Sequence, residues 1–420
     1  MNHLNIFNSF SNKPDSHEDA LTRSFLLLLK HIPLVQAGFM ELIGKNVPTA
    51  KLGSFLLDDL NVSEVYTQVP NSNNIFDLEK ISGKRIISII ISDDKLETEK
   101  TVKSSERGAR YDGVVFCDPD WVFIIENKPS KKNIWIEQLN PNLNNNLDVQ
   151  IVPEPCCLSW RVIIAFLNQL IVKDMVIGIE RALINDFIEY IDSTYAWLNP
   201  YTKFGICKDE SYLLNKRCIS VMAAFNGESE VKYHKGWKYY IDGIDNKIKQ
   251  IALDSHQEGS QWSVNLWMYA GDTMNSARDV YNAINIEKLK NLLENDSGYS
   301  ISTNFHLSYR STGLVWSSSK MCPIDYINYW KKQNIKQVSK EDLEFFLNEL
   351  IQRGIISSNE LDEYNQKILS KKYDKLNVCP GFLIKYTWPK QTTIDLENKN
   401  GFEVDFHEKV YAVYKIFDTL

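Results

Sequence analysis

Hydrophobic and polar positions divide the first half of the chain into helix-like and strand-like segments. Residues 14–32 (PDSHEDALTRSFLLLLKHI) have apolar positions at helical spacing behind a polar start, and QAGFMELIG at 36–44 predicts a second helix. SEVYTQVP at 63–70 and KRIISIIIS at 84–92 have the composition of strands. Residues 158–198 return to a strong helical period with one break. The order therefore predicts strands between two helical regions.

The second half alternates strand-like and helix-like segments less regularly. Strands are expected at 236–244, 261–271, 299–310, 312–318 and 380–391, and helices at 339–355, 358–373 and 403–417. The composition shifts near Gly227, so we expect two domains, one at 1–215 and another at 228–420. The predicted fold class is α/β (α+β): a mixed sheet flanked by helices, followed by a second α+β domain.

Composition and charge limit the classes of function. The chain has 420 residues, of which 44% are hydrophobic and 24% charged, and its net charge is −7. A protein that binds nucleic acid over much of its surface would be basic overall. Because this chain has a negative net charge, a polyanionic partner would need a local basic surface. The seven cysteines contain no CxxC, the N-terminus lacks a signal-peptide core, and no apolar run is long enough to span a membrane. We therefore expect a cytoplasmic protein with no membrane partner.

The candidate chemistry lies in RYDGVVFCDPDWVFIIENKPS at 110–130. Two apolar strands flank an Asp-Pro-Asp turn, which predicts a β-hairpin. If Cys117 pairs with Trp121, then Asp112 lies opposite Glu126, with Cβ atoms about 4.5–5.5 Å apart. Lys128 points to the same side as Glu126, and Asn127 points to the opposite face.

Two opposed carboxylates repel each other and lose water in an apolar sheet. A divalent cation between them would relieve the repulsion, because Mg²⁺ prefers oxygen ligands. Lys128 could then orient a water or stabilise charge on a phosphate. The alternative is a pair of solvated acids at the strand ends, with Lys128 forming an ion pair with Glu126.

The motifs around this hairpin resemble those of the PD-(D/E)XK nuclease superfamily. Several bacterial members have E-x-x-L-T, then R-x-D-G, then I-E-N-K, then Q-L. This chain has EDALT, RYDG, IENK and QL in the same order, within roughly residues 15–205. The tyrosine that often follows QL is replaced by NPNL, which puts the role of Gln138 in doubt more than the roles of the acids.

The resemblance implies a mixed sheet flanked by helices and a Mg²⁺ cofactor for which Mn²⁺ can substitute. It also implies roles for particular side chains. The expected metal ligands are Asp112, Glu126 and Glu18, and the other expected catalytic residues are Lys128 and Gln138. Apart from the resemblance, Arg110, Lys131 and Lys132 flank the proposed site and are expected to contact phosphate. Glu18 could equally serve only the helix N-terminus, where an acid is favourable without chemistry. For each basic residue taken singly, ordinary surface charge is the simpler interpretation.

The expected function is therefore a Mg²⁺-dependent nuclease, with DNA favoured over RNA. By analogy with fused nucleases, such a protein would be an effector of bacterial antiviral defence or restriction. Its C-terminal domain would sense a signal, bind a partner protein or form a homo-oligomer. The alternative is an inactive nuclease-like protein that binds nucleic acid or protein.

Overall fold

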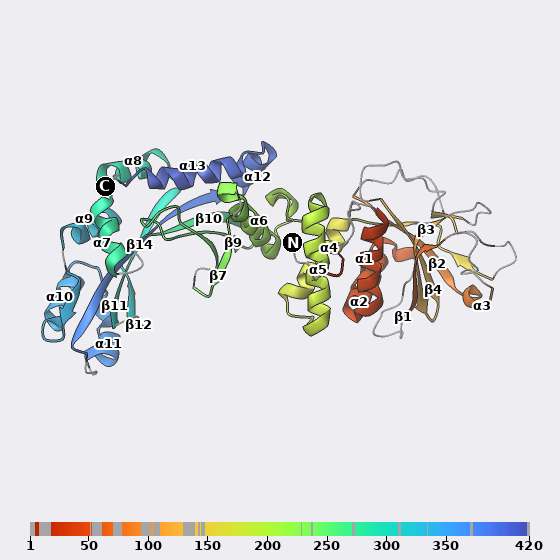
Figure 1. Cartoon of the computed structure of the whole chain (residues 1–420), viewed down its shortest axis with the longest axis horizontal. Coiled ribbons are helices and arrows are strands. Elements are labelled where there is room, and N and C mark those ends of the chain that lie inside the picture. Colours follow the sequence, from red (N-terminus) through yellow and green to blue (C-terminus); the bar gives the residue numbers. More distant parts are fainter. Residues whose placement is uncertain are drawn as a thin grey trace. The chain divides into compact units, whose positions relative to one another are not determined.

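The chain folds into two compact units, Met1–Thr202 and Lys203–Leu420, each built around its own β-sheet (Figure 1). The computed structural model describes residues 5–7, 18–50, 52, 61–69, 78–93, 102–103, 110–128, 139–141, 143, 148–227, 229–236, 238–270, 274–309, 312–333, 335–369 and 373–417. Both units mix helices with strands, in agreement with the expected mixed α/β class.

The first unit holds a sheet of six strands with helices before and after it. The strands are β1 (Asn61–Val69), β2 (Arg85–Ile91), β3 (Tyr111–Asp118), β4 (Trp121–Asn127), β5 (Gln150–Ile151) and β6 (Cys156–Leu158). The helices are α1 (Glu18–His31), α2 (Pro33–Asn46), α3 (Leu78–Ile81), α4 (Trp160–Val172) and α5 (Gly178–Thr194). The strand order is β1-β3-β4-β2-β5, with β6 also paired to β2. Strand β2 is parallel to β4, and β3 is antiparallel to β1 and β4.

The predicted hairpin register is confirmed. Cys117 pairs with Trp121 and Phe116 with Val122, and pairing continues to Gly113 and Ile125. Lys84, a residue outside the hairpin, stabilises the turn. Its Nζ donates to Asp118 Oδ1 at 2.8 Å and to Pro119 O at 2.9 Å. Continuing this register by one residue sets Asp112 opposite Glu126.

Both faces of this sheet are covered by apolar side chains. One face, with Ile89, Phe123 and Ile125, packs against α1, α2, α4 and α5 in a large core cluster. The other face, with Val114 and Ile124, joins a smaller cluster that includes α3. Burial on both faces explains why β2 reads as a continuous isoleucine-rich run rather than as an alternating pattern.

Helix α1 ends at His31, and α2 begins two residues later at Pro33, whose ring and missing N–H cannot continue the preceding helix. Within the described part of the chain, no single helix has the length and apolarity needed to cross a membrane. Only α1 and α2 taken together pass that test, and they are bent by 111°.

The second unit contains an eight-stranded sheet and most of the remaining helices. Its strands are β7 (Lys232–His234), β8 (Lys238–Asp242), β9 (Gln250–Glu258), β10 (Gln261–Ala270), β11 (Tyr299–Tyr309), β12 (Thr312–Ser318), β13 (Gln337–Ser339) and β14 (Lys375–Pro389). Its helices are α6 (Ser211–Ala224), α7 (Met274–Ala283), α8 (Ile286–Asn295), α9 (Pro323–Lys332), α10 (Leu343–Gln352), α11 (Leu361–Tyr364), α12 (Lys390–Asn398) and α13 (Phe402–Tyr414). The order is β12-β11-β14-β10-β9-β8-β7, with β13 paired to β14.

The division between the units falls at Thr202, earlier than the boundary expected near Gly227. Helix α6 explains the difference, because its side chains are bound to the second unit. Asn215 Oδ1 accepts hydrogen bonds from the backbone and the hydroxyl of Ser255 in β9, both at 3.0 Å. Arg217 lies 2.7 Å from Glu397 Oε1 in α12. The composition shift near Gly227 therefore marks the end of α6 inside the second unit, and not the boundary between the two units.

Candidate active site

Five strand ends meet at one edge of the first sheet. Strands β2, β4 and β6 are parallel, and Ile91 pairs with both Asn127 and Leu158 near the strand ends. Strand β3 begins at this edge and β1 ends there, since both pairings of β3 are antiparallel. Crevices beyond the carboxyl ends of parallel strands are favoured ligand sites in α/β sheets.

Asp112 and Glu126 occupy this edge on neighbouring strands. They share the face of Val114 and Ile124, because side chains two apart on a strand point the same way. Their exposed fractions are only 8% and 4%. Two buried carboxylates in opposed positions need positively polarised partners.

The protein supplies such partners to both acids. Asp112 Oδ2 accepts the backbone N–H of Asn127 at 2.8 Å, and Oδ1 accepts the side-chain amide of Gln68 at 3.3 Å. Glu126 Oε1 lies 2.7 Å from the ammonium group of Lys128. Each carboxylate therefore keeps a fixed orientation at the sheet edge.

Lys128 is held in place by its backbone as well as by Glu126. Its N–H donates to Ile91 O at 2.9 Å, which extends the parallel pairing of β4 with β2 by one residue. The side chain is 11% exposed. This positioned ammonium group fits either the catalytic or the ion-pair interpretation.

Asn127 points to the opposite face, as expected, and joins the sheet to two helices. Its Nδ2 donates to Thr22 Oγ1 in α1 at 2.8 Å, and its Oδ1 accepts the indole N–H of Trp160 in α4 at 2.8 Å. The residue is fully buried. It therefore fixes α1 and α4 against the strand that carries Glu126 and Lys128.

Sequence reasoning missed Gln68 and Asp19. Gln68 Nε2 lies 2.7 Å from Asp19 Oδ1, as well as 3.3 Å from Asp112 Oδ1. Its backbone has φ +52°, in the left-handed region that a side chain such as Gln rarely adopts. A lone Gln in a strand carries no sequence signal for this role. Asp19, by contrast, stands directly after the Glu18 that the motif selected.

A further carboxylate, Asp93, lies just beyond the end of β2. Ser159 donates a hydrogen bond to its Oδ1, and Arg161 lies 3.7 Å from its Oδ2. Ser159 also caps α4 by accepting the N–H of Arg161 at 3.1 Å.

Several predicted residues lie outside what the structure describes. Nothing is described of Gln138, Lys131 and Lys132, and α1 begins at Glu18 without a described side chain there. Arg110 is exposed and lies 3.8 Å from Asp19 Oδ2, next to the contact of Asp19 with Gln68. Among the residues whose placement is described, no three His, Cys, Asp or Glu side chains form a group suited to a metal ion.

Comparisons with protein-family models, with curated proteins and with solved structures find no match to this chain.

Proposed function

We propose that this chain is a divalent-metal-dependent nuclease of the PD-(D/E)XK type that hydrolyses phosphodiester bonds of nucleic acid, preferably DNA. The observation that supports it most is the placement of Asp112 and Glu126 opposite each other, with Lys128 on the same edge. The motif order EDALT, RYDG, IENK and QL adds to it.

The donor set fits Mg²⁺, because Asp112 and Glu126 offer two carboxylates on neighbouring strands. Mg²⁺ commonly takes one or two protein carboxylates and completes its shell with water and phosphate oxygens. Asp112 and Glu126 would hold it, and Glu18 is the proposed third ligand from α1. When bound, the ion would supply Lewis acidity and lower the pKa of a bound water.

The chain's own residues would orient the reaction. The N–H of Asn127 and the amide of Gln68 fix the direction of the Asp112 oxygens. Lys128 keeps a positive charge at a site that is largely closed to water, where it would stabilise the charge that develops on phosphate. Arg110 is exposed and would contact the phosphate backbone, with Lys131, Lys132 and Gln138 as further proposed contributors.

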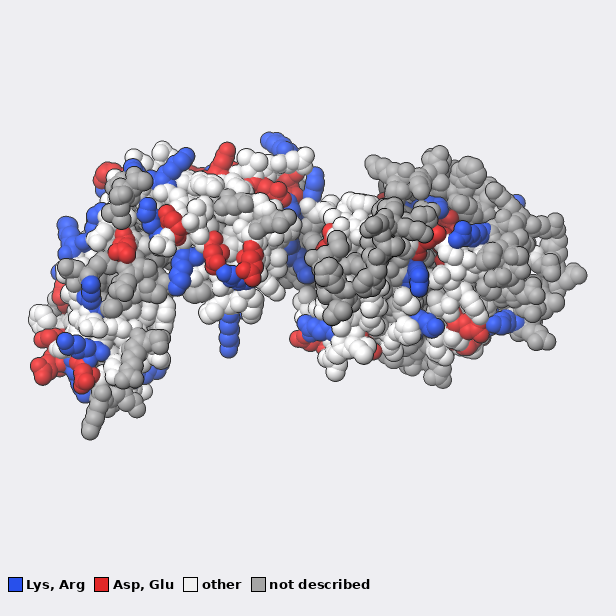
Figure 2. All heavy atoms as spheres, viewed as in Figure 1, with Lys and Arg blue, Asp and Glu red and all other residues white. Residues whose placement is uncertain are grey.

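Binding of nucleic acid would depend on this local site rather than on general attraction. Figure 2 shows Lys and Arg interspersed with Asp and Glu over the described residues of the visible face. The net charge of −7 also opposes nonspecific binding to a polyanion. All seven cysteines are free thiols, which suits the reducing cytoplasm that we propose for the protein.

By analogy with fused nucleases, we propose an antiviral or restriction effector whose second unit senses a signal, binds a partner or forms a homo-oligomer. One observation favours a second candidate, an inactive nuclease-like binding protein. Both carboxylates already have protein partners, Gln68 for Asp112 and Lys128 for Glu126, so the pair is stabilised without a metal ion.

Cleavage of supercoiled plasmid DNA and of a labelled RNA in Mg²⁺, Mn²⁺ or EDTA separates the two candidates. The nuclease proposal requires metal-dependent cleavage by the wild type and its loss in Glu126→Gln. Glu41→Gln serves as the matched control, because Glu41 is exposed on α2 and forms an i,i+4 ion pair with Lys45 on the same helix. Nucleic-acid binding without cleavage in either metal would favour the inactive binding protein.

A further inference from the structure

Lysines and aromatic residues are concentrated in the hairpin of β7 and β8, at one end of the second sheet (Figure 1). The nine residues 232–240 (KYHKGWKYY) contain three lysines and four aromatic residues, with no acid and no aliphatic side chain. Basic residues interleaved with aromatic ones are typical of surfaces that bind nucleic acid. The hairpin therefore differs from the rest of this acidic chain in both charge and composition.

Two tyrosines of the hairpin present their rings to solvent. Tyr233 in β7 pairs with Tyr239 in β8, and the two side chains are 61% and 43% exposed. Their ring centroids lie 5.2 Å apart, with an interplanar angle of 60°. Ile241, two residues along β8 on the same face as Tyr239, is fully buried, so the hairpin leaves the core between these two positions. The tyrosine rings therefore offer aromatic surface outside the core of the unit.

The lysines near the turn carry charge that no acid of the described chain neutralises by direct contact. Lys232, further from the turn, forms ion pairs with Asp242 across the hairpin and with Glu230, the latter at 4.0 Å. Lys235 and Lys238 are exposed, and neither side chain forms an ion pair or a hydrogen bond with a described residue. Their two positive charges are therefore available to an anionic partner.

We propose that this hairpin binds single-stranded nucleic acid. Bases would stack on the rings of Tyr233 and Tyr239, since every base has a flat aromatic face, and phosphates would contact Lys235 and Lys238. A duplex is disfavoured, because its bases are stacked on one another and do not reach a protein ring. A lipid surface is disfavoured as well, because residues 232–240 have no aliphatic side chain to enter a bilayer.

The hairpin lies wholly within the second unit, so its proposed role is independent of the nuclease site in the first unit. Binding is measured in EDTA, where metal-dependent cleavage does not occur. Binding of single strands by a protein that cleaves no nucleic acid would support the role of the hairpin and contradict the proposed nuclease. The reverse result, cleavage of plasmid DNA without binding of single strands by the hairpin, would contradict only the role of the hairpin.

The test is the fluorescence anisotropy of a fluorescein-labelled oligothymidylate of about 16 nucleotides, titrated with the full chain. We expect saturable binding that weakens as the salt concentration rises. The double variant Lys235→Gln/Lys238→Asn should weaken it about fivefold or more. It should also reduce the slope of log affinity against log salt by about 1.4, or about 0.7 for each phosphate contact that is lost. Asparagine suits position 238, because it tolerates the left-handed φ of +61° there.

Variants of the tyrosines separate stacking from charge. Tyr233→Leu/Tyr239→Leu should weaken binding about tenfold or more with an unchanged salt slope, because it removes the rings and keeps the lysines. A cross-strand aromatic pair also stabilises a hairpin. Tyr233→Phe/Tyr239→Phe keeps that pair and should bind within about twofold of wild type.

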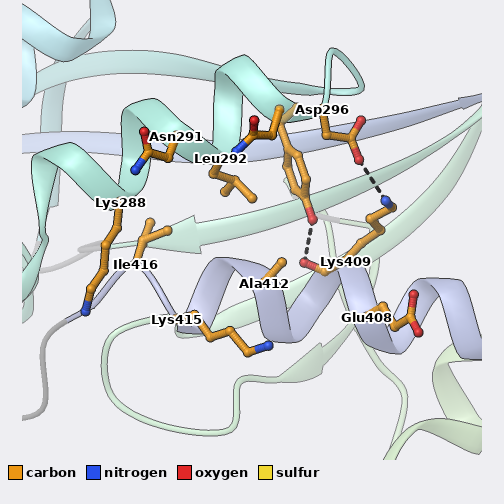
Figure 3. Close-up of a pocket in the computed structure, with 11 residues that line it drawn as sticks. Lys288, Asn291, Leu292, Asp296, Glu408, Lys409, Ala412, Lys415 and Ile416 are labelled. Atoms are coloured by element: carbon orange, nitrogen blue, oxygen red, sulfur yellow. Dashed lines mark hydrogen bonds and ion pairs between the residues drawn. The ribbon is translucent and has the colours of Figure 1, made fainter.

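The matched control is Lys320→Gln/Lys415→Gln, which changes the net charge by the same amount as the hairpin lysine variant. Both lysines are exposed in the second unit, and Lys415 lines a pocket between α8 and α13 instead (Figure 3). Binding that is weakened in the lysine and leucine variants of the hairpin and kept in this control would support the proposal.

Several results would overturn it. They are the absence of saturable binding by the wild type, equal weakening in the control, and an unchanged salt slope in Lys235→Gln/Lys238→Asn. Competition by a duplex as strong as that by the unlabelled single strand would also overturn it, as would binding to phosphatidylserine vesicles in place of the oligonucleotide. If circular dichroism shows that the leucine variant is unfolded, the lysine variant and its salt slope decide.

Discussion

The ammonium nitrogen of Lys128 lies 2.7 Å from Oε1 of Glu126, and the two side chains are only 11% and 5% exposed. A charge buried to this degree costs several kcal/mol unless it is paired. The pair therefore forms as a unit at the strand end. A substitution that neutralises one member leaves the other as a buried unpaired charge and so lowers the stability as well. Chemical and structural roles must therefore be separated by matched variants.

We predict that Lys128→Arg does not restore the activity of a nuclease that depends on Lys128. Arginine keeps the charge and can bind Glu126 through two hydrogen bonds, but it is planar, bulkier and does not release a proton. Single-turnover cleavage at saturating Mg²⁺ should fall about a hundredfold or more in both Lys128→Arg and Lys128→Ala. An arginine variant within a few-fold of wild type would leave Lys128 a structural ion-pair partner.

We also predict that Asp112→Asn and Glu126→Gln each weaken Mn²⁺ binding, measured by the loss of the free-ion electron paramagnetic resonance signal. Each change removes one anionic ligand while keeping the shape of the side chain. Glu126→Gln should in addition lower the free energy of unfolding in EDTA, because Lys128 keeps a largely buried charge without its carboxylate. Unchanged Mn²⁺ affinity in both variants would contradict the proposed ligand pair.

The elements with a clear period were predicted from sequence. The hairpin register followed from the turn and from the pairing rule, so the facing of Asp112 and Glu126 was predictable. Strand β9 and helix α8 were missed. QIALDSHQE in β9 combines an apolar start with a polar, exposed end, and IEKLKNLLEN in α8 has only Leu289 fully buried. Whether such segments form a strand or a helix depends on long-range packing rather than on the local pattern.

The site was predictable only where residues share one hairpin. Gln68 reaches Asp112 from β1, and Asp19 joins them from α1, 49 residues earlier in the chain than Gln68. No local pattern in the sequence marks Gln68 as a strand residue with a left-handed φ of +52°. The contact of Asp93 with Ser159 likewise needs the folded sheet.

Gln68→Glu tests whether the edge of the sheet attracts cations. A third carboxylate between Asp19 and Asp112 should lower the melting temperature in EDTA through like-charge repulsion. Adding Mn²⁺ should then raise the melting temperature more in the variant than in wild type, because ligand binding to the folded state stabilises it. Thr67→Glu, one residue earlier and exposed, is the control. An equal Mn²⁺ response in wild type and Gln68→Glu would argue against a cation site beside Asp112.

Asn127→Ala should lower the free energy of unfolding by about 2–4 kcal/mol in urea titrations, since it removes buried hydrogen bonds. Asn127 accepts the indole N–H of Trp160 and donates to Thr22, and loss of both partners uncouples α4 and α1 from β4. Asn46→Ala, which removes an exposed bond to Leu42 O, should cost less than about 0.5 kcal/mol. A similar small cost at Asn127 would mean that these helices are held mainly by apolar packing.

The last prediction concerns acid sensitivity of the second unit. Lys390 donates to Asp209 Oδ2 at 2.8 Å and Trp262 to Oδ1 at 2.6 Å, and these hydrogen bonds, that of Lys390 first, lower the pKa of Asp209 below its usual 3.8. A carboxyl whose pKa is lower in the folded state adds stability above its unfolded pKa and loses it as the pH falls through the folded pKa.

Asp209→Asn should therefore reduce the melting temperature at pH 7, and its difference from wild type should shrink as the pH falls below about 4. The effect at neutral pH should stay within about 1 kcal/mol, because the ion pair is partly exposed. Asparagine is suited to the comparison, since it tolerates the left-handed φ of +61° at this position. Asp362→Asn, an exposed acid in the same unit, is the control. A difference that stays constant from pH 7 to pH 2 would show that packing, rather than the charge of Asp209, stabilises the contact with Trp262 and Lys390.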